Sequence, residues 1–170
     1  MRKFYLALLL TISGTMVILP SVKAISESNE KHQQLTVSEQ GYSLSLPGEY
    51  TLQKEEEGKD ILFSTKTPYT WMRIEVLSEK ESTSKSYLDH SKELFDDQFG
   101  KSLKISSTTS LFIQPVVFAS TSGSKKETAK LYVLRATKGH PALKITMVTA
   151  RNSDDEKKLI SIVNSVKTHE

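Results

Sequence analysis

Three residues with metal-ligand chemistry recur at helical spacing near the middle of the chain: His90, Glu93 and Asp97. At about 100° per residue they fall within an arc of about 60° on one helix face. An imidazole and two carboxylates on one face can ligate a divalent cation and leave coordination positions open. The alternative is a solvated acidic helix face that also carries a histidine, and we favour this second interpretation.

Other catalytic motifs are absent from the sequence or incomplete. The chain has no cysteine and no Gly-x-Ser-x-Gly segment, and its seven glycines are too scattered for a phosphate-binding loop. Ser82 and Lys85 form a Ser-x-x-Lys pair, but the Ser-Asp-Asn and Lys-Thr-Gly segments that accompany it in penicillin-binding enzymes are missing. No pair of carboxylates stands out for glycoside hydrolysis. We therefore expect no catalytic residue, no metal site and no cofactor.

Two aromatic residues at the start of a predicted strand are candidates for binding. The segment Pro68-Tyr69-Thr70-Trp71 contains the only tryptophan of the chain. Exposed aromatic side chains at loop edges are favoured anchors in protein interfaces. We therefore predict a partner contact at Pro68, Tyr69 and Trp71. In the alternative interpretation, Trp71 fills the second face of a sheet that is covered on both sides.

The first 24 residues have the pattern of a secretory signal peptide. Positive Met1-Arg2-Lys3 precedes an apolar run over 4–19, then helix-breaking Pro20 and a cleavage site after Ala24. The alternative is an uncleaved anchor, but the run of 16 residues is short for a spanning helix. We expect a signal peptide at 1–24, a flexible polar arm at 25–39, and no transmembrane segment after cleavage.

The charge of the chain changes when the leader is set aside. The sequence has 23 basic and 20 acidic residues, but three basic residues, Arg2, Lys3 and Lys23, lie in the leader. The mature chain is therefore neutral, which argues against a nucleic-acid partner. A secreted domain without cysteine has no disulfide framework and is typical of bacteria. We expect a secreted or extracytoplasmic bacterial location.

Apolar periodicity predicts a mixed domain over residues 40–168. Strands are expected at 42–46, 50–53, 60–65, 71–77, 129–137 and 142–150, with one or two more over 103–118. One helix is expected from Ser86 to a Gly100 cap, and a second from Ser153 to Val166. Because almost all strand connections are short hairpins, the class is α+β, with helices packed on an antiparallel sheet.

Two details of these elements set further expectations. The pairs Ser86 with Asp89 and Ser153 with Glu156 have the spacing of capping boxes. The strands at 129–137 and 142–150 carry apolar residues on both faces. Such strands are usually covered on both sides.

The chain as a whole resembles PsbP-like domains. The segment Gly41–Tyr50, with its glycine, aromatic residue, alternating apolar residues and proline, is similar to the opening of that family. Ile74-Glu75-Val76, the helix from Ser86 and the closing Ile162–Lys167 extend the resemblance over about residues 40–168. The matching positions are structural, so no functional residue is transferred.

The resemblance implies an α/β/α sandwich with a central antiparallel sheet flanked by helices. The family includes Mog-type proteins and bacterial envelope proteins of the DcrB and LpqN type, which act mostly by docking on other proteins. We therefore expect an exported, non-catalytic accessory domain that docks on a protein or cell-envelope component. There are two alternatives. One is an extracytoplasmic hydrolase with a carboxylate or metal site, for which His90, Glu93 and Asp97 are the first candidate residues. The other is a small-ligand carrier.

Overall fold

The computed structural model describes residues 33–105, 111–151 and 153–169. The predicted signal peptide at 1–24 and the first part of the predicted arm, 25–32, lie outside the described residues. Where the arm was expected to continue, Gln33–Val37 forms strand β1, which pairs with β2 (Tyr42–Pro47). Nearly all of β1 is exposed, so hydrogen bonds to the partner strand, not side-chain burial, hold it extended.

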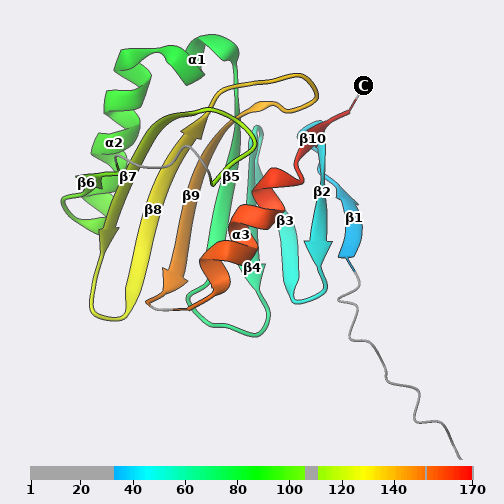
Figure 1. Cartoon of the computed structure of the whole chain (residues 1–170), viewed down its shortest axis with the longest axis horizontal. Helices are drawn as coiled ribbons and strands as arrows, with labels where there is room; N and C mark the ends of the chain where they lie inside the picture. The colour runs from blue at the N-terminus through cyan, green and yellow to red at the C-terminus, as the bar shows by residue number, and fades with distance from the viewer. Residues whose placement is uncertain (1–32, 106–110, 152, 170) are drawn as a thin grey trace, which may run out of the picture. The chain divides into compact units, whose positions relative to one another are not determined.

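A seven-stranded antiparallel sheet dominates the domain (Figure 1), in the order β3-β4-β5-β9-β8-β7-β6. Its strands are β3 (Tyr50–Glu56), β4 (Lys59–Ser64), β5 (Trp71–Leu77), β6 (Leu103–Lys104), β7 (Val116–Gly123), β8 (Glu127–Leu134) and β9 (Ala142–Ala150). Most neighbouring strands in the sheet are joined by hairpins. The exception is β5, which pairs with β9, a strand far from it in the sequence. The antiparallel sheet and three helices confirm the predicted α+β class.

A smaller sheet, which the sequence analysis did not predict, has the order β1-β2-β10. Its third strand, β10 (Lys167–Thr168), has only two residues, too few to show a periodicity. In β2, the alternation of Tyr42, Leu44 and Leu46 predicted one apolar face, and all three side chains are buried in the main core.

A short helix, α1 (Glu79–Thr83), lies in the polar segment between β5 and the next helix, where no helix was expected. Ser78 accepts a hydrogen bond from the backbone of Glu81, whose side chain in turn accepts one from the backbone of Ser78. This capping box satisfies backbone groups that would otherwise lack partners, so five polar residues suffice for a helix.

The next helix, α2 (Lys85–Phe99), begins before the predicted position. Its N-cap is Ser84, whose hydroxyl oxygen accepts a hydrogen bond from the Tyr87 backbone at 3.4 Å. The predicted cap at Ser86 is therefore wrong, because that residue already lies inside the helix. Gly100 ends the helix with a positive φ of 81°, as predicted.

The last helix, α3 (Asp155–Asn164), begins without the predicted capping box. The Ser153 hydroxyl accepts a hydrogen bond from the Asp155 backbone at 3.4 Å, and the Glu156 carboxylate pairs with Lys130 of β8. The Glu156 side chain is thus drawn to the sheet and does not close on the helix N-terminus.

Both faces of β8 and β9 are buried, as their sequences predicted. On one face, Tyr132 and Ile145 join the main core with Leu159 of α3. On the other face, Leu131 packs in a second cluster with Phe95 of α2. Because neighbouring residues of one strand point to opposite faces, α2 and α3 cover opposite sides of the large sheet.

A buried carboxylate links the small sheet to the large one. Asp60 of β4 is 2% exposed and accepts hydrogen bonds from the hydroxyls of Ser38 and Tyr42, the latter at 2.6 Å. Burial, together with the hydrogen bond to Asp60 and its negative charge, raises the pKa of the Tyr42 hydroxyl. The donor therefore stays protonated, and the contact fixes the end of β2 against β4.

Replacing Asp60 with alanine should lower the free energy of unfolding by about 2–4 kcal/mol, because two buried hydroxyls lose their acceptor. Urea denaturation of the full chain measures this change. Asp97→Ala, which removes an exposed carboxylate from α2, is the matched control and should leave the curve unchanged. Equal effects of the two substitutions would contradict the proposed link.

Candidate functional site

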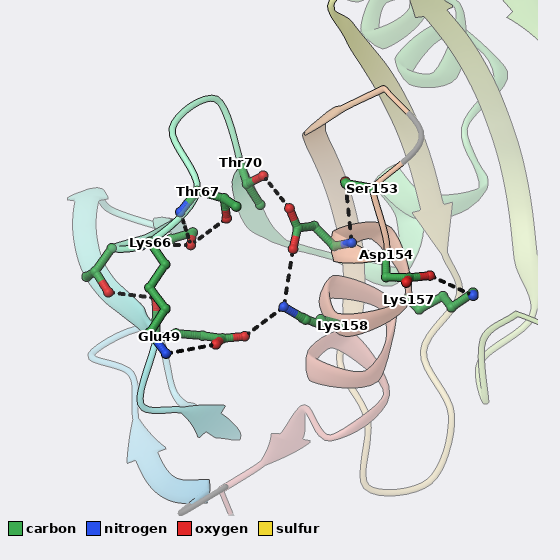
Figure 2. Close-up of polar contacts among 11 residues, drawn as sticks. Glu49, Lys66, Thr67, Thr70, Ser153, Asp154, Lys157 and Lys158 are labelled. Atoms are coloured by element: carbon green, nitrogen blue, oxygen red, sulfur yellow. Dashed lines mark hydrogen bonds and ion pairs between the residues drawn. The ribbon is translucent and has the colours of Figure 1, made fainter.

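The loop between β4 and β5, residues 65–70, contains two of the three predicted contact residues, and we name it the contact loop. Its ends are joined, because the backbone of Ser64 donates a hydrogen bond to the Thr70 carbonyl at 3.0 Å. The backbone of Thr65 donates to the Glu49 carbonyl at 2.8 Å, and the Ser64 hydroxyl accepts from the backbone of Thr67 at 3.0 Å (Figure 2). The backbone of the loop is thus held by bonds to the end of β4 and to the turn that precedes β3.

Tyr69 combines high exposure with an unfavourable backbone conformation. Its side chain is 71% exposed and its φ is 70°, the only positive φ of a non-glycine residue in the part of the chain that the structure describes. A left-handed backbone costs a non-glycine residue on the order of 1 kcal/mol. Pro68 beside it is exposed too, so the loop presents two apolar side chains to solvent.

Trp71 lies in a different environment from Tyr69. It is partly buried at the start of β5, where its ring centroid lies 6.2 Å from that of Phe99. Phe99 in turn contacts Phe95, at 4.9 Å between ring centroids, in the cluster under α2. This position agrees with the alternative interpretation, in which Trp71 fills the second face of the sheet.

A polar network lies beneath the contact loop and ties it to α3 (Figure 2). Thr70, 2% exposed, donates a hydrogen bond through its hydroxyl to the Asp155 carboxylate at 3.0 Å. The Lys158 ammonium lies 3.3 Å from the other Asp155 oxygen and 3.0 Å from a Glu49 carboxylate oxygen. One cation thus joins two carboxylates from different parts of the chain, and the loop follows the position of the helix.

The network also has a marked electrostatic character. The hydrogen bond to Glu49, and secondarily the one to Asp155, raise the pKa of Lys158 against the opposing effect of desolvation. Burial, helped by the charge of Asp155 and opposed by that of Lys158, raises the pKa of Tyr50 to about 12. At neutral pH, Lys158 is therefore charged and Tyr50 is not, so the ammonium offsets part of the negative charge of the two carboxylates.

The residues first considered for metal binding do not form a coordination site in the described part of the chain. His90 Nδ1 lies 3.7 Å from a Glu93 oxygen, and both side chains are largely exposed on α2. Asp97 is exposed on the same helix. Across residues 33–105, 111–151 and 153–169, no group of three such side chains has a geometry that could hold an ion.

Ser82, the candidate nucleophile of the Ser-x-x-Lys pair, is fully buried. Its hydroxyl donates a hydrogen bond to the Glu79 carbonyl at 2.8 Å within α1. The hydroxyl is therefore directed to the helix backbone, and this structural role in α1 explains why a serine stands at this position.

Comparison with known proteins yields structural neighbours only. No family model and no curated protein matches the sequence. A solved protein of Bacteroides thetaiotaomicron matches with a TM-score of 0.52 and 10% identity, over 81% of this chain and 49% of that one. The chain thus spans about half the length of that protein. The Ran-binding protein Mog1p of Saccharomyces cerevisiae matches with a TM-score of 0.51 and 8% identity, over 80% and 96% of the two chains.

These identities show a shared fold and no more. The likeness to Mog1p agrees with the fold that the resemblance to PsbP-like domains implied. Among the described residues, no helix is both long and apolar enough to cross a membrane.

The residue pattern at 68–71 directed attention to the contact loop, whereas no local pattern indicates the network that holds it. The preference of helix N-termini for negative charge would account for the whole cluster Asp154-Asp155-Glu156. Asp154 fits that explanation because it is exposed, whereas Asp155 is 4% exposed and bonds to Thr70, 85 positions away. Nothing local distinguishes the two residues.

Replacing Lys158 with methionine should lower the free energy of unfolding by about 1–2 kcal/mol, because two mostly buried carboxylates lose their shared cation. Urea denaturation of the full chain measures it. The matched control is Lys157→Met, since Lys157 pairs with Asp154 at the surface, where both side chains are more than 80% exposed. That variant should unfold like the parent, and a loss as large as that of Lys158→Met would contradict the role of the network.

Proposed function

We propose that this chain is an exported accessory domain that docks on a protein or cell-envelope component and performs no chemistry itself. We also propose that its fold is of the PsbP-like type, an α/β/α sandwich with helices flanking the central sheet. The single observation that carries the docking proposal is Tyr69, an exposed aromatic residue on a strained but firmly held loop.

The physical properties of Tyr69 suit a docking anchor. Large aromatic side chains contribute a disproportionate share of interface free energy when they enter a pocket of the partner. Because the contact loop is fixed by its own hydrogen bonds and by Asp155, little backbone entropy would be lost on association. Strained backbone also concentrates at functional sites, where the surrounding structure maintains it.

The chemistry of the contact loop indicates what the partner offers. The exposed Pro68 and Tyr69 fit an apolar hollow on the partner. Lys66 lies in the same loop with a side chain that is 74% exposed, 3.6 Å from a Glu49 oxygen. We expect an acidic group at the rim of that hollow, where it would add to the rate and orientation of docking more than to affinity.

Two further observations support this class of function. The structural neighbour Mog1p is described as a Ran-binding protein, so at least one protein of similar fold has a protein partner. The leader-like first 24 residues support export to an extracytoplasmic or secreted location. The neutral charge of the mature chain argues against a nucleic-acid partner.

Tyr69→Gly should raise the free energy of unfolding by about 0.5–1 kcal/mol, because glycine adopts a φ of 70° without strain. Thermal or urea denaturation measures the change. This outcome would show that Tyr69 is kept for a reason other than stability. A clear loss of stability would contradict the proposal, since it would mean that the phenol ring supports the fold.

The same substitution tests docking in the cell. The tagged chain is cross-linked at native expression, and captured proteins are identified by mass spectrometry. A reproducible partner should be lost with Tyr69→Gly and kept with the control Leu94→Ala, which removes an exposed apolar side chain from α2. Capture of the same partner at parental yield with Tyr69→Gly would mean that docking uses another surface. If the parent chain captures no protein, that result would count against docking altogether.

A further inference from the structure

The hairpin between β7 and β8 borders a basic pocket that docking through the contact loop does not use. This pocket, which we name the hairpin pocket, has a volume of about 330 Å³. Its walls include the following residues: Lys101, Leu103, Thr121, Ser124, Thr128 and Arg151.

Strand register explains why the floor of the hairpin pocket is open and polar. Leu103 lies opposite Thr121, and Gly123 lies opposite Thr128, so these four residues share one face of the sheet. Gly123 contributes no side chain, and a Cβ atom there would lie 2.9 Å from the Glu127 carbonyl oxygen. Close approach of the two strands thus requires glycine, which leaves space between two threonine hydroxyls.

Two cations flank this floor. The Arg151 guanidinium donates one hydrogen bond to the Ser124 carbonyl at 3.2 Å, which orients the group and leaves most of its donors available. Lys101 lines the same pocket. Among the described residues, neither cation has a carboxylate within ion-pair distance, and no acidic residue lines the pocket.

The nearest acidic residue in the hairpin points away from the pocket. Glu127 precedes Thr128 in β8, and consecutive residues of a strand face opposite sides of the sheet. Lys125 and Lys126, both exposed at the tip, add positive charge nearby. In a mature chain of zero net charge, such a local excess creates a positive potential that attracts anions.

We propose that the hairpin pocket binds a phosphate group carried by a small polyol or sugar. Arg151 and Lys101 supply charge-assisted hydrogen bonds to the phosphate oxygens. The hydroxyls of Ser124 and Thr128 add donors, since the Ser124 oxygen accepts bonds from the Lys126 and Glu127 backbones and keeps its own proton free. The volume exceeds that of a phosphate group alone, and Leu103, 71% exposed, offers an apolar wall to the carbon atoms.

The test is an NMR titration of the isotope-labelled full chain, in which binding is measured from amide chemical shifts. Glycerol 1-phosphate, inorganic phosphate and neutral glycerol are added in separate titrations. Glycerol 1-phosphate should bind with a Kd on the order of 1 mM or below and shift amides of the hairpin. Inorganic phosphate should bind more weakly at the same amides, and glycerol should not bind. Equal affinity for the two phosphates would assign the site to free phosphate and overturn the polyol part of the proposal.

Three variants make the outcome decisive. Arg151→Gln should weaken binding about tenfold, as expected for the loss of a charge-assisted contact. Lys138→Gln removes the same charge at the turn between β8 and β9, at the other end of β8 from the hairpin, and should leave binding unchanged. An equal loss in both variants, or no localised shifts up to about 10 mM ligand, would overturn the proposal. Tyr69→Gly should bind the phosphate like the parent, so the hairpin pocket and the contact loop are tested separately.

Discussion

Strands β8 and β9 carry apolar side chains on both faces, and the other layers of the domain serve to keep those two faces from water. Tyr132 and Ile145 need cover on one side, and Leu131 needs it on the other. Burial of such side chains is worth roughly 1.5–3 kcal/mol each, which makes double cover a strong constraint on a domain without disulfides. α3 and α2 meet that constraint from opposite sides, and the small sheet joins the main core through Tyr42 and Leu44.

The position of α3 has a consequence for the surface of the molecule. Its first turn places Asp155 and Lys158 beside the end of β4, where they meet Thr70 and Glu49. A buried carboxylate needs hydrogen bonds or a cation, so the helix and the contact loop determine each other's position. The contact loop is therefore tied to the core helix beneath it, and the strained backbone of Tyr69 is maintained by the surrounding structure rather than by its own preference. An exposed aromatic side chain on a backbone held in this way suits the docking that we propose.

Whether a feature of this fold can be predicted from the sequence depends on how far apart in the chain its interacting residues lie. The predicted strands at 71–77 and 142–150 coincide with β5 and β9, because long apolar segments bounded by turn residues are a local signal. The start of α2 was misplaced because serines at 84 and 86 offer equivalent caps, and only the end of α1 at Thr83 selects the first of them. The network under the contact loop depends on partners far along the chain, so periodicity and capping signals cannot predict it. Strand β1 pairs with the neighbouring β2, but its only apolar residues are Leu35 and Val37, which give too weak a periodic signal. The exposure of Tyr69 and the partial burial of Trp71 likewise became distinguishable only once β5 had a register.

The most direct test of docking is photo-cross-linking from defined positions of the contact loop and of a distant surface. A photoreactive amino acid is placed at position 69 and, in a second chain, at position 113, where Ile113 is 64% exposed. Both chains are irradiated in cells at native expression. Docking through the contact loop predicts one dominant adduct from position 69 that is weak or missing from position 113. Adducts of equal yield from both positions, or an adduct from position 113 alone, would contradict it.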